Sequence, residues 1–548
     1  MFRKSQISQS DLFESPSNLM SKRASKKYDD PKSWHNQFFT LVTSQVNEDN
    51  FAPLFKDSLR GAPTASIRIL VSMSVLKEGF GCSDEQLFEK CEYDLLVRKA
   101  LGLINLKDKT PSLDTYYCFR RRLVEYEDSK GVNLMDTCFK DITAEQIKMF
   151  DIAGKSVRMD SKLIGSNIAW YSRYRLILTT LQQWAESGIA SLNPSLRKKL
   201  EPFIKEDGQK TEYHSDSETV YKRLTSLGKL IYQILVRIKA NDSLLLKRVF
   251  DEQFLVEKGV VTPREKKTIS AKSVQNPNDP DANYRSKGDQ KIKGYSVNIT
   301  ETNDDDDKPS LITDVTVKPA TAADNSYLQD SVNATGEITG NAVERINADG
   351  AYQSEANRAF ADENNIQFIT TGLQGKQPRI DIYFEDETLI AVDRKTDEKL
   401  PVKKVKDKWR VTIEGKYCYL TPEQIDKRLL RKQLEAIPKE LLDKRNNVEA
   451  AMFQVSFHTR NNKTRYRGLL KHSLWAEARC LWMNFVRLMI FRITVCQRTI
   501  FDLYKVIVEF VKTQILSRIE TFPTPNYYRL ARGRRRFTLL YPMYCAFC

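Results

Sequence analysis

The sequence predicts a mixed α/β fold that is preceded by an all-helical region and interrupted by a small β-sheet insertion. Apolar residues recur at helical spacing over about 36–150. Strand-like alternation begins at 156–164, returns at 294–300 and 310–317, and then gives way to alternating helices and strands. Between 378 and 420 the alternation is β throughout, so this segment is expected to form a separate sheet.

Composition limits the class of protein. The 548 residues are 41% apolar and 29% charged, as expected for folded globular domains, and the length suggests three or four structural units. The formal charge of +16 favours a polyanionic partner, with nucleic acid first, although many basic proteins bind none. Nine scattered cysteines fit a reducing cytoplasm better than a disulfide framework. No secretory signal is recognisable at the N-terminus, and charges interrupt the apolar stretch 485–516, so no membrane association is expected.

The N-terminal part reads as a flexible basic arm over 1–35, followed by a helical DNA-binding region over 36–150. A helix over 66–76 ends at a glycine turn, and Ser83 can cap the next helix, which resembles a helix-turn-helix. A third helix over 113–123 carries three arginines suited to contacts with DNA, or equally to a solvated basic face. These arginines are Arg120, Arg121 and Arg122.

The first core strand carries Asp160. Aspartate has poor strand propensity, so some interaction is expected to hold it there. A charged helical insertion is expected over about 170–265. The acidic run 304–307 is interpreted as a solvated hairpin loop rather than a metal site. Asp349 ends a later strand before a sharp turn, and a helix and a further strand follow it in a parallel crossover.

After the β insertion, Thr421 and Gln424 have the spacing of a capping box. A helix over about 441–458 carries Arg445 and Glu449 on one face. An amphipathic helix and a basic tail complete the chain over 476–548, and the tail either contacts nucleic acid or is a disordered basic segment.

Three carboxylates therefore stand at distinctive places: Asp160, Asp349 and Glu449. Strand ends and a crossing helix can bring such groups together, and their mutual repulsion then requires cations. Oxygen ligands suit Mg²⁺ or Mn²⁺, and two such ions can promote in-line phosphodiester displacement. From placement alone, a structural role for each carboxylate is the alternative. Asp349 would then belong to a plain turn, and Glu449 would form an ion pair with Arg445.

Several segments, taken in order, resemble those of DDE transposases from bacterial insertion sequences, in the group whose core carries a β-strand insertion. The resemblance spans roughly 35–490. The segments are 157–161 (VRMDS), 278–285 (NDPDANYR), 293–295 (KGY), 313–317 (TDVTV), 323–324 (AD), 348–352 (ADGAY), 445–449 (RNNVE) and 463–468 (KTRYRG).

The resemblance implies an RNase H-like core in which Asp160, Asp349 and Glu449 bind two Mg²⁺ or Mn²⁺ ions. It implies that Arg445 contacts DNA phosphate. Two positions depart from the family signature: its tyrosine is replaced by Leu442, and its lysine falls at Ser456. Lys463 or Arg460 can take over the missing phosphate contact.

Three further residues enter the hypothesis. Asp314 is the rival of Asp349, which is preferred because its strand follows a helix, as a crossover next to the first strand requires. Arg285, beside the 279–281 turn, is a candidate for DNA contact or for ordering the rim of the site. Trp409 in the insertion could stack on a flipped base, but packing within the insertion is the favoured interpretation.

The resulting domain prediction divides the core into 151–377, an insertion at 378–420, and a final core segment at 421–475. The expected function is cut-and-paste transposition: metal-dependent cleavage at element ends, then strand transfer into target DNA. The expected partner is double-stranded DNA, bound by a homodimer in the bacterial cytoplasm at the nucleoid. The alternatives are a DNA-binding repressor or inactive relative, and another nuclease or resolvase with the same core.

Overall fold

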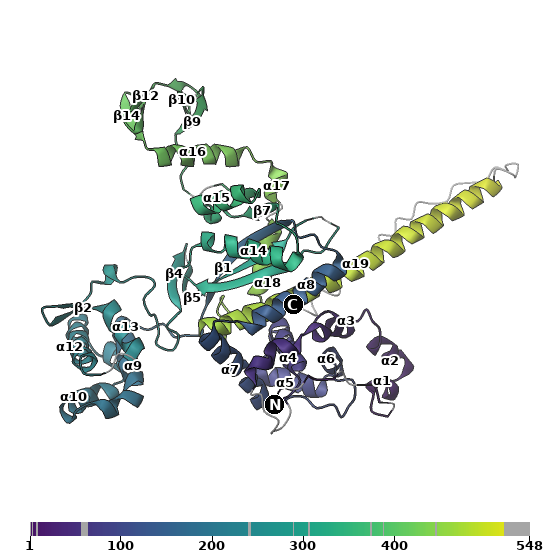
Figure 1. Cartoon of the computed structure of the whole chain (residues 1–548), viewed down its shortest axis with the longest axis horizontal. Coiled ribbons are helices and arrows are strands. Elements are labelled where there is room, and N and C mark those ends of the chain that lie inside the picture. The colour runs from purple at the N-terminus through teal and green to yellow at the C-terminus, as the bar shows by residue number, and fades with distance from the viewer. Residues whose placement is uncertain are drawn as a thin grey trace. The chain divides into compact units, whose positions relative to one another are not determined.

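The computed structural model describes two compact units, shown together in Figure 1. The first unit comprises Met1–Phe119 and Leu481–Cys548, and the second comprises Arg120–Cys480. The described residues are 2, 4–6, 9–11, 13–55, 64–238, 243–288, 290–304, 307–372, 375–386, 388–443 and 446–519. The predicted basic tail and the last two cysteines therefore lie outside the described residues.

The first unit is helical, as predicted. Ser66 caps α4, whose C-terminal end is Gly81 in the left-handed conformation, with φ of 67°. Ser83 and Gln86 form a complete capping box at the start of α5. The helices of this unit are α1 (Pro16–Leu19), α2 (Lys22–Tyr28), α3 (Trp34–Leu41), α4 (Ile67–Phe80), α5 (Asp84–Tyr93), α6 (Leu95–Ala100) and the start of α7 (Leu113–Lys130).

Residues 1–35, predicted as a flexible arm, include the helices α1 and α2. Tyr28 at the end of α2 is buried, and its ring stacks on His35 with 5.8 Å between the ring centroids. The Lys99 ammonium lies 4.6 Å from the centroid of the same tyrosine ring. A buried aromatic anchor thus orders a segment whose composition suggests mobility.

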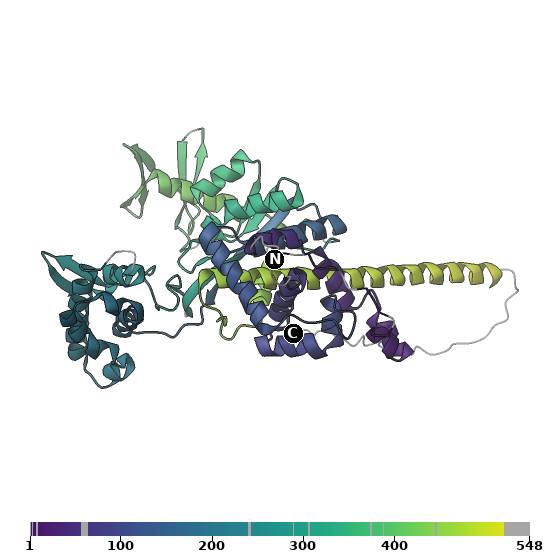
Figure 2. The same ribbon diagram turned by 60° about the horizontal axis from the view of Figure 1, so that its bottom comes forward.

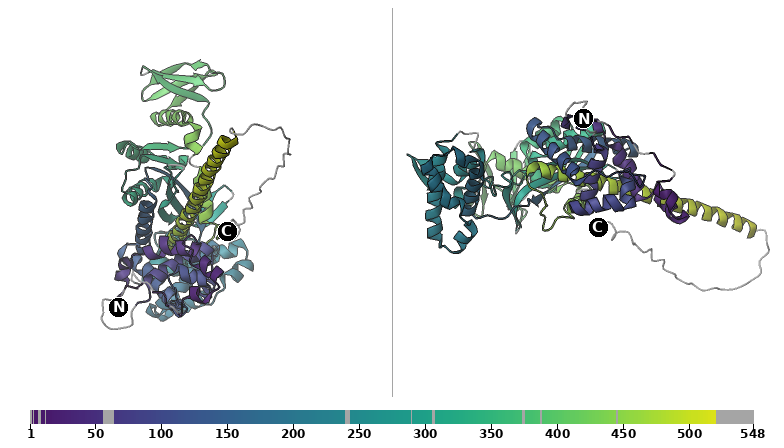
Figure 3. Two further views of the ribbon diagram at one scale, coloured as in Figure 1. Left: turned by 90° about the vertical axis from the view of Figure 1, so that its right-hand side faces the viewer. Right: turned by 90° about the horizontal axis from the view of Figure 1, so that it is seen from below.

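The predicted C-terminal helix is present as α19 (Leu469–Ile519), the long yellow helix in Figure 3. Trp482 and Phe485 of this helix pack with aromatic side chains of the first unit. The ring of Phe38 lies edge-on to that of Phe485, with 5.1 Å between the ring centroids. The ring centroids of Phe80 and Trp482 are 5.2 Å apart. A large aromatic core therefore joins the two ends of the chain within this unit.

The second unit is built on a six-stranded mixed sheet. The strand order is β4–β5–β1–β7–β8, and β6 also pairs with β5. Strand β1 runs antiparallel to β5 and parallel to β7, and β7 runs parallel to β8. The strands are β1 (Ser156–Gly165), β4 (Asn283–Lys287), β5 (Gln290–Thr302), β6 (Ile312–Pro319), β7 (Arg345–Ala348) and β8 (Gln367–Thr370). The predicted α/β class with a helical N-terminal region is confirmed.

The two faces of the sheet have different chemistry. On one face, an apolar core that includes Met159 and Ile346 packs beneath α14 (Leu328–Thr339) and α15 (Glu355–Glu363). Side chains alternate along a strand, so Arg158, Asp160 and Lys162 point to the opposite face. There the Lys162 ammonium donates to the Ser456 hydroxyl at 2.6 Å, just beyond the end of α18 (Asn446–Val455). Helix α18 packs against β1.

The segment after β1 forms a largely helical body with a core of its own, visible in Figure 2. The sequence predicted helix as far as about 265, but the chain turns into a hairpin of two strands from Phe254 onward. Phe254 itself is buried in the helical core, and β2 begins at this residue, directly after α13 ends. The elements are α9 (Arg173–Gly188), α10 (Pro194–Ile204), α11 (Gly208–Tyr213), α12 (Ser217–Leu235), α13 (Leu244–Gln253), β2 (Phe254–Glu257) and β3 (Val260–Pro263).

The predicted β insertion is present as two three-stranded sheets that share one small core. Their strands are β9 (Ile380–Glu385), β10 (Thr388–Asp393), β11 (Lys399–Leu400), β12 (Val402–Val405), β13 (Lys408–Ile413) and β14 (Lys416–Leu420). Thr421 and Gln424 then form the predicted capping box of α16 (Pro422–Glu435). The short α17 (Lys439–Asp443) precedes α18. In the described part of the chain, no helix is long and apolar enough to cross a membrane.

Candidate metal centre

Asp160 lies in the middle of β1, the strand between β5 and β7. Its carboxylate is partly buried, and one oxygen accepts a hydrogen bond from the backbone N–H of Ser161 at 2.8 Å. In the antiparallel ladder Asp160 is paired with Ile299 of β5. The ladder to β5 extends over the whole of this part of β1, whereas the ladder to β7 covers Ser156–Arg158.

Asp349 follows directly after β7, the parallel neighbour of β1. Arg158 is paired with Asn347, so Asp349 continues the strand to the level of Asp160. Its Oδ1 accepts hydrogen bonds from the Gly350 N–H at 2.6 Å and from the Thr371 hydroxyl at 2.8 Å. These contacts orient one oxygen of the carboxylate.

Gly350 is required by a close approach of backbone. A Cβ at this position would lie 2.7 Å from the carbonyl oxygen of Gly372 and 2.9 Å from that of Thr371. Neither atom is the end of a flexible side chain. Glycine therefore allows the turn after Asp349 to pack against the segment that follows β8.

The two aspartates share one face at one level of the sheet. Neighbouring strands lie about 4.8 Å apart, so carboxylates at facing positions repel each other unless a cation lies between them. Carboxylate oxygens are the donors that Mg²⁺ and Mn²⁺ prefer. The donor set of Asp160 and Asp349 therefore fits a hard divalent cation.

Glu449, the third predicted ligand, lies on α18 with an exposed side chain. Among the residues that the structure describes, no three His, Cys, Asp or Glu side chains are close enough to hold a metal ion together. The structure places Asp160 and Asp349 on one face and at one level of the sheet, and it places Glu449 on α18, which packs against β1. Arg445 lies outside the described residues.

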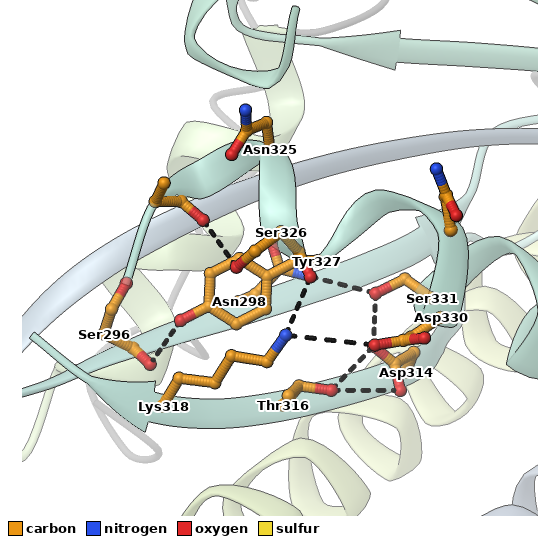
Figure 4. Close-up of polar contacts among 12 residues, drawn as sticks. Ser296, Asn298, Asp314, Thr316, Lys318, Asn325, Ser326, Tyr327, Asp330 and Ser331 are labelled. Atoms are coloured by element: carbon orange, nitrogen blue, oxygen red, sulfur yellow. Dashed lines mark hydrogen bonds and ion pairs between the residues drawn. The ribbon is translucent and has the colours of Figure 1, made fainter. Parts of the chain in front are cut away.

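Asp314, the rival of Asp349, lies on β6, which pairs with β5 and not with β1. Asp314 is paired with Thr300 of β5, whereas Asp160 is paired with the preceding residue, Ile299. Because successive side chains on a strand point to opposite faces, the Asp314 side chain lies on the face opposite Asp160. Figure 4 shows its carboxylate held by the hydroxyl of Ser331 at 2.6 Å and by that of Thr316. Burial raises the pKa of the Asp314 carboxyl above its usual range. The topological argument that favoured Asp349 agrees with this placement.

A buried ion pair flanks the candidate centre. Arg158, two residues before Asp160, is 5% exposed and pairs through its Nε with Glu301, which is fully buried. The guanidinium also donates to the Asn303 side chain at 3.1 Å. Because Arg158 and Glu301 are cross-strand neighbours, the pair fixes β1 against β5 beside Asp160.

The three arginines of α7 have different surroundings. The Arg120 guanidinium lies 5.0 Å from the centroid of the Tyr466 ring. Arg121 is exposed and lies 3.6 Å from Glu125, one turn along the helix. Arg122 is exposed as well. Their predicted DNA contacts stay predictions.

Two other predicted DNA contacts have structural partners within the second unit. The Lys463 ammonium donates to the backbone carbonyl of Ile168 at 2.9 Å, and Arg460 is exposed beside it. The Arg285 guanidinium donates to the carbonyl of Ala322 at 2.9 Å. It also lies 3.8 Å from Asp324. These bonds anchor loops of the second unit.

Trp409 on β13 is partly buried against the core of the insertion. The Lys404 ammonium lies 5.7 Å from the centroid of its ring. Trp409 is paired with buried Leu420 on the neighbouring strand, so it points into the small core. This placement agrees with the favoured interpretation of packing within the insertion.

Two structural aspartates were not recognised as such from the sequence. The buried carboxylate of Asp279 accepts hydrogen bonds from Ser166, from the Tyr295 hydroxyl at 2.5 Å and from the Gly468 N–H at 2.9 Å. Asp304, expected in a solvated loop, accepts from two backbone N–H groups at the start of β1, at 2.6 and 2.8 Å. These contacts join segments far apart in sequence and leave no local signal.

One orienting residue near the candidate centre was also missed. Thr371, whose hydroxyl donates to Asp349, directly follows β8. A hydroxyl at the end of the strand beside Asp349 is a signal that could have identified it.

Residues 26–122 match a family model described as "Transposase domain (DUF772)", and they cover most of the helices of the first unit. No curated protein matches the chain, and no solved structure matches it. The N-terminal region is therefore similar to a transposase domain, and this similarity supports a transposase family for the chain.

Proposed function

We propose that this protein is a DDE transposase that cleaves DNA at element ends and joins the freed 3′ ends to target DNA. The observation that carries the proposal is the placement of Asp160 and Asp349 at one level and on one face of two adjacent parallel strands. The similarity of residues 26–122 to a transposase domain supports the same reaction class. The strand order β6–β5–β1–β7–β8 is consistent with the RNase H-like core that the sequence resemblance implies.

The carboxylates of Asp160 and Asp349 would hold Mg²⁺ or Mn²⁺, with Glu449 of α18 completing the set. When bound, such ions supply activation of the attacking oxygen and charge neutralisation of the leaving oxygen. Thr371 and the Gly350 N–H fix the orientation of the Asp349 carboxylate. The excess of positive charge on the chain favours a double-stranded DNA partner, and synapsis of two ends calls for a homodimer.

A DNA-binding repressor without cleavage is the second candidate. It is favoured by one observation: in the described residues, Glu449 does not join the two aspartates in a three-ligand group. The cleavage experiment separates this candidate from the proposed transposase.

The test incubates the purified full chain with DNA from the flanks of its gene, where short inverted repeats are expected, in Mg²⁺ or Mn²⁺. The proposal predicts nicks at the repeat ends with wild type and none with Asp160→Ala, Asp349→Ala or Glu449→Ala. Asp330→Ala is the matched control, because Asp330 is an exposed aspartate on α14 and should leave cleavage unchanged.

Three outcomes would contradict parts of the proposal. Binding without cleavage in either metal would favour the repressor. Cleavage that survives Asp349→Ala and is lost in Asp314→Ala would reject the second ligand. Cleavage that survives Glu449→Ala would remove the glutamate from the site.

A further inference from the structure

We propose that Tyr352 and Asn298 are positioning residues that hold the Asp349 turn in register with Asp160. The inference rests on the proposed function, because it concerns the same two carboxylates. Both residues lie on the face of the sheet opposite the carboxylates.

Tyr352 closes the short 3₁₀ turn Gly350–Tyr352 that begins directly after Asp349. The backbone N–H of Tyr352 donates to the carbonyl of Asp349 at 3.0 Å, so the ring and the carboxylate belong to one turn. The side chain is fully buried, and its hydroxyl donates to the Asn298 Oδ1 at 2.6 Å. Because both its backbone N–H and its hydroxyl are hydrogen-bonded, Tyr352 limits the movement of the whole turn.

Asn298 lies on β5, directly opposite Ser161 in the ladder between β1 and β5. Ser161 is the residue after Asp160, so Asn298 lies within one residue of the level of Asp160. The Tyr352 hydroxyl therefore meets Asn298 of β5, the strand on the other side of β1 from β7. One contact thus ties the Asp349 turn to the strand level of Asp160.

The hydrogen bonds of Asn298 and Ser161 continue away from the metal-binding carboxylates and end on two buried aspartates, Asp314 and Asp324. The Asn298 side-chain amide donates to the Ser331 hydroxyl at 3.3 Å, and that hydroxyl donates to Asp314. The Ser161 hydroxyl donates to Asp324 at 2.8 Å. Figure 4 shows the Asn298, Ser331 and Asp314 part of this network beneath α14. Buried polar side chains that are paired with one another specify one arrangement of the strands.

A metal centre needs this kind of support. Removing a residue that orients a metal ligand without binding the metal itself commonly lowers metal affinity about 10- to 100-fold. Asp160 and Asp349 come from different strands, so their separation depends on what fixes β7 and its turn against β1. The network supplies that constraint from the face opposite the metal.

The test measures Mn²⁺ binding to the full chain by electron paramagnetic resonance, which reports the unbound ion and does not depend on DNA cleavage. Tyr352→Phe removes the hydroxyl and keeps the ring, and we expect about tenfold weaker Mn²⁺ binding. Asn298→Ala removes the partner and should weaken binding in the same direction. The double variant should be no weaker than the more affected single variant, since both act through one contact.

Tyr327→Phe is the matched control. Tyr327 is equally buried in the same apolar core, and its hydroxyl donates to the Ser296 carbonyl at 3.1 Å. We expect wild-type Mn²⁺ affinity from this variant. Thermal unfolding of both variants separates loss of fold from loss of positioning.

The outcomes distinguish this inference from the proposed function. If wild type binds Mn²⁺ and loses it in Asp160→Ala and Asp349→Ala, the metal centre stands. If Tyr352→Phe then binds as tightly as Tyr327→Phe, the positioning role alone is overturned. If wild type binds no Mn²⁺, or binds it equally well without the two aspartates, the metal centre falls and the positioning role falls with it.

Discussion

The buried pair of Arg158 and Glu301 gives a prediction that can be worked from the structure. With 5% and 0% exposure, both charges have left water, so each depends on the other for compensation. Glu301→Gln keeps the shape and one oxygen acceptor but removes the negative charge. Breaking one side of a buried pair costs about 3–5 kcal/mol, and we expect about 3 kcal/mol because the acceptor is retained.

Hydrogen exchange followed by mass spectrometry measures this loss locally, which suits a chain with two compact units. About 3 kcal/mol corresponds to roughly 150-fold faster exchange of amides in β1 and β5. The control is Glu344→Gln, because the pair of Lys155 and Glu344 joins the segments before β1 and β7 with both side chains exposed. Removing that exposed pair should leave the exchange unchanged.

The double variant Arg158→Met with Glu301→Leu provides a second check. Replacing both charges of a buried pair by apolar side chains is commonly neutral or stabilising. Exchange in β1 should therefore return close to the wild-type rate. If Glu301→Gln speeds exchange no more than Glu344→Gln does, the reasoning about the buried pair is wrong.

Two further predictions concern a turn and a titrating group. Gly350→Ala should lower the free energy of unfolding by about 1–3 kcal/mol and abolish Mn²⁺-dependent cleavage, because its Cβ would meet two backbone carbonyls. Gly336→Ala in α14 is the control and should be tolerated. Equal activity of the two variants in the nicking assay would refute this prediction. Burial, followed by the charge of Asp136, raises the pKa of Glu127 to about 7, so the folded state binds its proton more tightly and stability should fall as pH rises from about 4.5 through 7. Glu127→Gln should flatten this part of the melting temperature profile, and an unchanged slope would contradict the assignment.

Local chemistry explains what could be predicted from the sequence. Ser83 and Thr421 are predictable as helix caps because a cap depends on residues within one turn. The strands of the sheet and of the insertion were recognised by their period-two alternation. The preference for Asp349 over Asp314 came from connectivity, and the strand order agrees with it.

The remaining features depend on partners distant in sequence. Glu301 and Tyr352 meet their partners across the sheet, and nothing in their neighbours indicates the pairing. Asp304 was expected in solvent because four acidic residues in a row resemble a loop, yet it binds the start of β1. The position of Glu449 relative to the aspartates depends on how α18 packs on β1, which helical periodicity does not determine.

The central claim is that Asp160 and Asp349 hold a divalent cation. A crystal of the full chain soaked in Mn²⁺ and measured at a wavelength where manganese scatters anomalously tests it most directly. We expect an anomalous peak about 2.0–2.2 Å from carboxylate oxygens of both aspartates, on the face of the sheet that carries α18. A peak at Asp314, or no peak between Asp160 and Asp349, would contradict it.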